Sequence, residues 1–153
     1  MNNFTTYYEE SNKNKRVNKF NIHWQIVRTQ AKAIKSVKDK IQHVLSFLEE
    51  NPNHHNYIRV LNWLKTTGMA YPKGSPMAQA FHDAIDTLAE NVEDYVNVLD
   101  DIDNDLSNIS TEDLKMVLKD LNKRKYNFQF KKTPQDHIDF VATVEKELET
   151  RNV

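Results

Sequence analysis

Cysteine is absent from the 153 residues of this chain. Its absence excludes disulfides, thiolate metal ligands and cysteine nucleophiles together. Glycine and proline are scarce, with two and four residues respectively, which favours long helices with few connections. Two glycines are also too few for most loops that cradle a nucleotide. No hydrophobic run approaches the roughly 18 residues that a membrane span requires.

The first residues, MNNFTTYYEESNKNKR, do not resemble a secretory signal peptide, because no apolar segment follows a basic start. Without such a segment or a membrane span, the chain is expected to be cytoplasmic. Hydrophobic residues make up 39% of the chain and charged residues 28%. These proportions and the length predict one ordinary globular domain.

Charge is distributed unevenly along the chain. Residues 1–75 contain 12 Lys and Arg against 5 Asp and Glu, whereas residues 76–153 contain 9 against 17. Two interpretations stay open. The halves could pack together and neutralise each other, or they could form two functional faces.

Two long helices are predicted from hydrophobic spacing. Residues 17–50 and 76–106 each carry apolar positions that alternate in steps of four and three, broken in the first segment only by Lys38, a pattern typical of supercoiled helices. The first helix should stop at Asn51-Pro52, because proline disfavours a helical residue before it. The second should begin at Ser75-Pro76, a serine N-cap followed by proline in the first turn.

Shorter helices complete the prediction. One spans about 54–67 and ends at Gly68, a second begins at Ser110, and a third follows Thr133-Pro134. KYNFQFKK, residues 125–132, is extended in character. The fold class is therefore all-α: an elongated bundle of about five helices in one domain, 17–150, preceded by a flexible polar arm, 1–16. The expected core contains Trp24, Val27, Ile34, Ile41, Leu45, Leu61, Phe81, Ile85, Leu88, Tyr95, Leu99 and Leu118.

A calcium loop is the first chemical hypothesis to weigh. Asp101, Asp103, Asp105 and Glu112 have the spacing of ligands in an EF-hand, but that loop needs glycine at its sixth position, where Leu106 stands. The alternative is an acidic helix end followed by a helix that Ser110 caps. We favour the helix end, and no metal or cofactor is predicted.

Histidines offer little further support for chemistry. His82 with Asp86 could share a metal, but one pair is a weak site. His54 and His55 are adjacent beside a proline, and His137 is expected on an exposed helix start. No Glu-x-x-His, Gly-x-Ser-x-Gly or phosphate loop occurs. The chain is therefore predicted not to be an enzyme.

Two charged faces are the candidate binding sites. The arm and the first helix carry basic residues that could follow phosphates: Lys13, Lys15, Arg16, Lys19, Arg28, Lys32 and Lys35. The second long helix carries an acidic face that could occupy a basic cleft on a protein partner: Asp83, Asp86, Glu90, Glu93 and Asp94.

MNNFTTYYEES, an aromatic cluster followed by glutamates, resembles the amino termini of small proteins of T-even-like marine tailed phages. The resemblance implies a role in virion assembly or host takeover, located in the virion or the host cytoplasm. The leading functional prediction is a non-enzymatic helical adaptor or scaffold that forms a homo-oligomer. The alternatives are an accessory nucleic-acid-binding protein and an acidic-helix inhibitor of a nucleic-acid enzyme.

Overall fold

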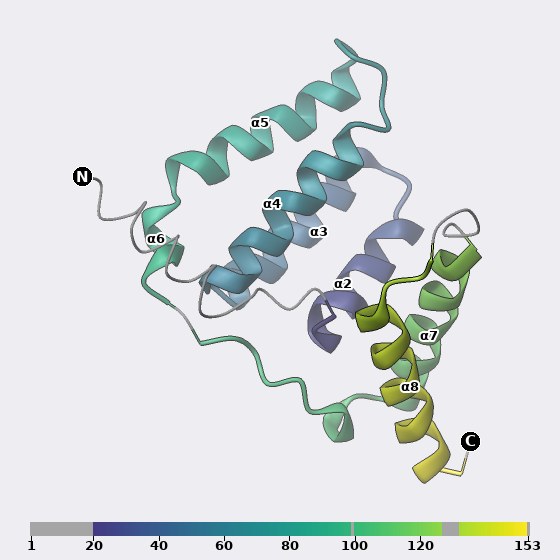
Figure 1. Cartoon of the computed structure of the whole chain (residues 1–153). Helices are drawn as coiled ribbons and strands as arrows, with labels where there is room; N and C mark the ends of the chain where they lie inside the picture. Colours follow the sequence, from purple (N-terminus) through teal and green to yellow (C-terminus); the bar gives the residue numbers. More distant parts are fainter. Residues whose placement is uncertain (1–19, 99, 127–131, 153) are drawn as a thin grey trace. The chain divides into compact units, whose positions relative to one another are not determined.

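The computed structural model describes residues 20–98, 100–126 and 132–152. Within these residues the chain forms seven α-helices, one 3-10 helix and no strand, which confirms the all-α prediction but not the number of helices (Figure 1). The elements are α2 (Ile22–Ala33), α3 (Val37–Glu50), α4 (His54–Gly68), α5 (Pro76–Glu90), α6 (Glu93–Val96), η1 (Leu106–Asn108), α7 (Thr111–Tyr126) and α8 (Gln135–Thr150). The predicted arm, 1–16, and most of KYNFQFKK lie outside the described residues.

The chain divides into two compact units, and the single domain expected over 17–150 stays a prediction. Unit 1 contains residues 31–102 of the described chain, and unit 2 contains residues 20–30 and 103–152. Helix α2 contributes its first turns to unit 2 and its last residues to unit 1. Each unit is described by itself.

The first predicted long helix is wrong, because it breaks at residues 34–36. Ser36 has an extended backbone, and its hydroxyl accepts a hydrogen bond of 3.3 Å from the Asp39 N–H. A serine in this position caps a new helix, α3, instead of continuing the old one. The predicted end of this segment is confirmed, since α3 stops at Glu50 before Asn51-Pro52.

The second predicted long helix is also wrong beyond Glu90. α6 is four residues long, and residues 97, 98 and 100–105 are not helical. Asn and Asp side chains here bind the backbone, as Asp101 does with the Ile102 N–H at 2.8 Å and Asn104 with the Ile22 N–H at 2.7 Å. Such bonds compete with helical hydrogen bonds. The acidic run is therefore an irregular connection and not a helix end.

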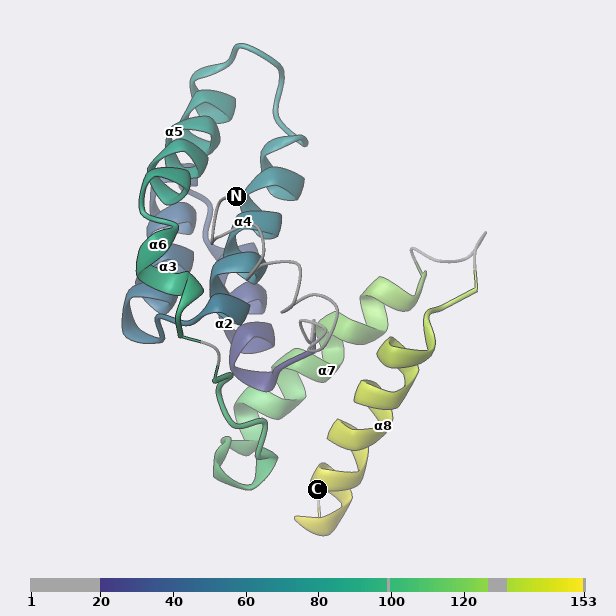
Figure 2. The same cartoon turned by 60° about the vertical axis from the view of Figure 1, so that its left-hand side comes forward.

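Unit 1 is built on α3, α4 and α5, which lie side by side (Figures 1 and 2). The Tyr57 hydroxyl donates a 3.1 Å hydrogen bond to the Leu88 carbonyl and so joins α4 to α5. Apolar side chains fill the space between the helices: Ile41, Val44, Phe47, Leu48, Tyr57, Val60, Trp63, Leu64, Ala78, Phe81, Ala84, Leu88 and Val96.

Val98 and Asp101 are both hydrogen-bonded to α4. The His54 N–H, one of the donors that a helix start leaves unsatisfied, donates a 2.7 Å hydrogen bond to the Val98 carbonyl. Further along α4, the buried Arg59 guanidinium donates two hydrogen bonds of 2.7 Å to the Asp101 carboxylate. The irregular segment is thus fastened to unit 1 at two points.

Unit 2 is built on α7 and α8, which run antiparallel (Figures 1 and 2), together with the first turns of α2. Arg151 follows α8 and donates to the Ile109 and Leu106 carbonyls at 2.7 and 2.8 Å, which holds the 3-10 turn against the end of α8. The core of the unit is apolar: Ile22, Leu106, Leu114, Val117, Leu121, Phe140, Val141, Val144 and Leu148.

Helix starts were predicted better than the core. Ser75 and Ser110 accept hydrogen bonds from Ala78 and Asp113 N–H groups, as capping requires. Thr133 does not cap α8, which starts after Pro134 without a side-chain cap. Of the expected core, four residues are buried: Trp24, Ile41, Phe81 and Leu88. Seven are half-buried: Val27, Ile34, Leu45, Leu61, Ile85, Tyr95 and Leu118. Leu99 lies outside the described residues.

Candidate binding surfaces

The predicted basic stripe of the first helix is not one continuous surface. Lys13, Lys15, Arg16 and Lys19 lie outside the described residues. Lys32 and Lys35 are exposed, but α2 ends at Ala33, so Lys35 does not continue its face. Arg28 is half-buried and belongs to unit 2, whereas the two lysines belong to unit 1.

Arg28 lies in an electropositive cluster with Arg124. The Arg124 guanidinium donates a 2.6 Å hydrogen bond to the Gln25 side-chain oxygen and lies 3.4 Å from the Asp120 carboxylate. Burial and the charge of Arg124 lower the pKa of Arg28 to about 10, although Asp120 opposes them. Two guanidiniums thus share one nearby carboxylate, and unit 2 holds an excess of positive charge at this point.

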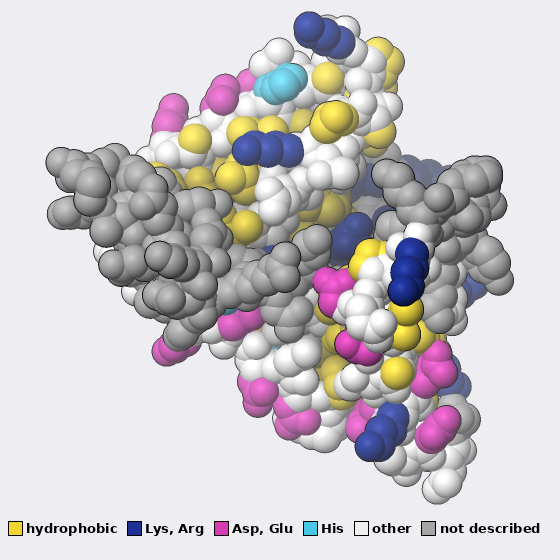
Figure 3. Space-filling view, in the orientation of Figure 1, with side chains coloured by type: hydrophobic (Ala, Val, Ile, Leu, Met, Phe, Trp, Pro, Cys, Tyr) yellow, Lys and Arg dark blue, Asp and Glu magenta, His cyan; other side chains and the backbone are white. Residues whose placement is uncertain are grey.

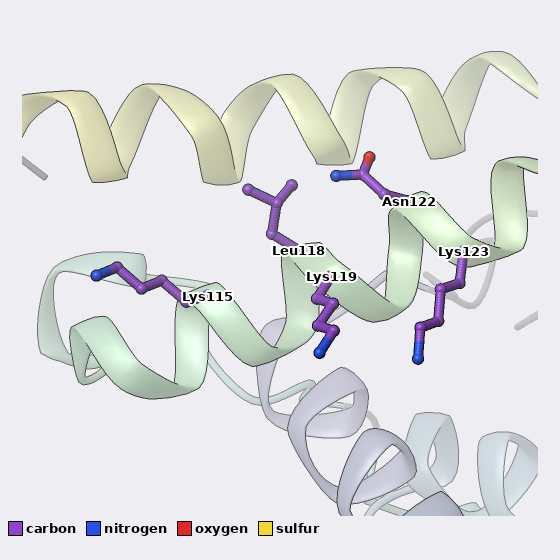
Figure 4. Close-up of a pocket in the computed structure, with 5 residues that line it drawn as sticks. All are labelled: Lys115, Leu118, Lys119, Asn122 and Lys123. Atoms are coloured by element: carbon purple, nitrogen blue, oxygen red, sulfur yellow. The ribbon is translucent and has the colours of Figure 1, made fainter.

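Three lysines at intervals of four residues form what we call the α7 lysine row: Lys115, Lys119 and Lys123. All three are exposed, because Leu114, Val117 and Leu121 turn the opposite face of α7 into the core. A hollow of about 420 Å³ is lined by the row together with Leu118 and Asn122. Figure 4 shows Leu118 and Asn122 directed toward α8, while Lys119 and Lys123 point away from it.

The predicted acidic face is exposed on α5 and α6. Asp83, Asp86 and Glu90 follow one another along α5, and Glu93 and Asp94 continue on α6. Asp83 accepts a 2.9 Å hydrogen bond from Gln79. The segment after α6 adds an apolar side chain, Val98, which is 43% exposed.

A groove opens where α4 ends and α5 begins; we call it the α4–α5 groove. Its volume is about 490 Å³, within the roughly 300–1,000 Å³ of ligand pockets. The lining residues are Leu64, Lys65, Gly68, Met69, Tyr71, Lys73, Ala78, Phe81, His82 and Ile85. Basic and histidine side chains stand beside hydrophobic ones over α4 and α5 (Figure 3). Carboxylates are absent from this lining, so the groove is apolar with a basic rim.

Gly68 allows the two helices to approach closely at the groove. A Cβ atom at this position would lie 2.9 Å from the Phe81 Cβ, nearer than such atoms approach in proteins. The Phe81 ring in turn stacks on Tyr71, with centroids 5.3 Å apart. The floor of the groove is therefore a fixed aromatic surface.

Three histidines are buried: His54, His55 and His137. His54 and His55 are 0% and 6% exposed at the start of α4. Burial, and then the charge of His55, lower the pKa of His54 below 6.5. His137 is 2% exposed rather than on an exposed helix start, and its Nε2 lies 3.0 Å from the Leu121 carbonyl. His82, by contrast, is exposed and lines the α4–α5 groove.

The acidic run does not assemble a metal site in the described part of the chain. The Asp101 carboxylate is held by Arg59, and the Asp105 carboxylate accepts hydrogen bonds from Ser107. Leu106 belongs to a 3-10 turn and is buried. Among described residues, no three His, Asp or Glu side chains converge as metal ligands.

Two surfaces were not predicted from the sequence: the α7 lysine row and the α4–α5 groove. The four-residue spacing of the α7 lysine row is present in the sequence. The row lies in residues 76–153, however, where the excess of Asp and Glu drew attention away from its lysines. The α4–α5 groove had no linear signal, because residues of α4, the 69–75 turn and α5 form it together.

A membrane-crossing helix was not found in the described ranges, where every helix is too short or too polar. Comparisons with protein-family models, with curated proteins and with solved structures found no significant match.

Proposed function

We propose that this protein works by binding and not by catalysis, as a helical adaptor that assembles head to tail. In this arrangement, the α4–α5 groove of one copy binds the surface that Glu93, Asp94 and Val98 form on the next copy. The observation that carries the proposal is the pairing of an apolar groove with a basic rim and an exposed apolar side chain with acidic neighbours, both in unit 1.

The two surfaces lie at opposite ends of α4. Leu64 and Gly68, near the end of the helix, line the groove, whereas the first N–H of the helix binds the Val98 carbonyl. α4 has 15 residues, so the two ends are separated by about 20 Å at ~1.5 Å per residue. Surfaces at opposite ends of a rigid helix can be used by two neighbours at once.

The chemistry of the two surfaces is complementary. Met69 beside the groove is 84% exposed, a large apolar side chain that a partner would remove from water. Lys65, Lys73 and His82 are cationic or protonatable, and they would face Glu93 and Asp94 of the neighbouring copy. An apolar centre with a polar rim is the usual organisation of a protein interface.

The heptad positions do not provide this interface. Ile41, Leu48, Phe81 and Leu88 are buried within unit 1 of the single chain. A head-to-tail contact joins different surfaces of two copies and produces rings or filaments instead of closed two-fold dimers. The N-terminal resemblance to small phage proteins, which implies virion assembly, supports the same proposal.

The first experiment is light scattering behind size exclusion over a range of protein concentrations at low salt. We expect a mass above 18 kDa that rises with concentration. Met69→Glu should lower this mass by placing a carboxylate at the groove. Ile138→Glu is the matched control, because Ile138 is 38% exposed but belongs to unit 2.

A charge-swap experiment identifies the two surfaces. One variant carries Lys65→Glu and Lys73→Glu, and the other carries Glu93→Lys and Asp94→Lys. Each should be monomeric alone, because like charges would then meet at both contacts. Mixing the two variants restores opposite charges at every contact and should restore assembly. A wild-type protein that stays at 18 kDa at every concentration would overturn the proposal.

A further inference from the structure

The α7 lysine row is a surface that self-assembly does not use. It belongs to unit 2, whereas the groove and the acidic face belong to unit 1. The exposed positions on this face after Glu112 are Lys115, Lys119 and Lys123. Among the side chains that the structure describes, none forms an ion pair with these three ammonium groups.

We propose that the α7 lysine row binds the phosphate backbone of a nucleic acid. Residues four apart on a helix are displaced by roughly 6 Å along its axis, so the row presents a regular line of positive charge. Each lysine can act as a point charge for one phosphate. The Asn122 amide also lines the hollow, on the side directed toward α8, and adds a hydrogen-bonding group there (Figure 4).

Further positive charge lies on the same helix. Arg124 follows Lys123 directly, and with Arg28 it outnumbers the single carboxylate of Asp120. The potential along the last turns of α7 is therefore positive beyond the row itself.

An anionic membrane is a less suitable partner for this face. A helix that lies in a membrane interface needs an exposed apolar face beside its basic one. In α7 that face is used internally, since Leu114, Val117 and Leu121 are 0% exposed. A folded acidic protein is also less suitable, because Leu118, the apolar residue that lines the hollow, is half-buried and not an exposed anchor for an interface centre. A flexible polyanion such as a nucleic acid needs neither an exposed apolar helix face nor an apolar anchor.

Three phosphate contacts predict a definite salt dependence. The logarithm of affinity should fall with the logarithm of salt concentration, with a slope of about −2 for single strands and nearly −3 for a duplex. Binding that rests on such contacts alone does not depend on base sequence. We therefore expect similar affinities for oligonucleotides of different composition.

The test measures fluorescence anisotropy of a labelled single-stranded DNA of about 20 nucleotides and of the matching duplex, with the full chain, at several salt concentrations. Replacing the row by Lys115→Gln, Lys119→Gln and Lys123→Gln should weaken binding at low salt at least tenfold and flatten the slope. The matched control replaces Lys32, Lys35 and Lys38 by Gln, since these lysines are also exposed. It removes the same charge from unit 1 and should change affinity less than twofold.

The alternative outcomes overturn the proposal. Equal losses in both triple variants would show only a general effect of net charge, and unchanged binding of the row variant would place the site elsewhere. Anionic vesicles and polyglutamate serve as competing probes. If either displaces DNA at equal charge concentration, the row is not a nucleic-acid site. Met69→Glu, which removes assembly, should retain the row's salt slope, so failure of one proposal leaves the other testable.

Discussion

Replacing Asp101 with Asn removes the ion pair that joins this residue to Arg59 on α4. Two hydrogen bonds of 2.7 Å join the carboxylate to Arg59, whose side chain is 2% exposed, whereas that of Asp101 is 24% exposed. Arg59 would then keep its 2.9 Å hydrogen bond to the Asn56 side-chain oxygen. The substitution therefore leaves a buried guanidinium without its counter-charge.

The expected loss lies between two limits. Exposed ion pairs contribute up to about 1 kcal/mol, and breaking a fully buried pair costs about 3–5 kcal/mol. Solvent reaches Asp101 and screens part of the interaction, and Asn retains one acceptor for Arg59. We therefore expect Asp101→Asn to lower the free energy of unfolding of unit 1 by about 2 kcal/mol.

Tryptophan fluorescence can follow the two units separately during urea unfolding. Trp63 lies in unit 1 and Trp24 in unit 2, so Trp24→Phe leaves a reporter for unit 1 alone. Asp86→Asn is the control, because Asp86 is an exposed residue of α5, and it should change the free energy of unfolding by less than about 0.5 kcal/mol. If Asp101→Asn had no larger effect than this control, the pair would not hold the segment.

The pair also predicts a pH dependence. Burial acts to raise the pKa of Asp101, but the hydrogen bonds and charge of Arg59 outweigh it, and the pKa falls below 3.8. A carboxyl whose pKa is lowered by folding stabilises the protein fully above its unfolded pKa. This stabilisation is lost as the pH falls below the unfolded pKa and through the lower pKa of the folded state. The difference between wild type and Asp101→Asn should therefore shrink below about pH 4.

Three further changes should have measurable effects on stability. Gly68→Ala should lower the melting temperature, because a clash with Phe81 costs about 1–3 kcal/mol and exceeds the helix gain of at most about 1 kcal/mol. Gly74→Asn, with φ at +83° and open space, should be tolerated. Arg151→Met should destabilise unit 2 by about 1–3 kcal/mol in urea, because two carbonyls lose their donor. Stability of unit 1 should decline as pH falls below 6.5, since folding favours neutral His54, and His54→Gln should reduce that decline.

Local chemistry made several helix boundaries predictable. Ser75-Pro76 and Ser110 act within one turn of themselves, and Asn51-Pro52 stops a helix through the geometry of its own backbone. Ser36 has the same kind of cap, but the hydrophobic spacing continued through it and concealed the break. The periodic pattern and the cap competed at that point, and the cap ended the helix.

The acidic face was predictable because its carboxylates follow one another within one short stretch of the chain. The acidic face on α5 and α6 was read from spacing, and its members are exposed. The basic stripe from Arg28 to Lys35 was not continuous, because its helix ends between them. Arg59, which has no basic residue beside it in the sequence, pairs with Asp101, 42 positions away. No local pattern indicates such a partner.

By itself, the sequence determined that the chain is helical, where several helices begin, and that its charge is divided between two halves. These properties depend on residues within a few positions of one another, so they are written in the order of the chain. Tertiary structure alone decided that the chain divides into two compact units, that the acidic run is irregular, and that an apolar groove lies between α4 and α5. Each of those depends on contacts between distant residues, whose balance of burial and hydrogen bonding no local spacing contains.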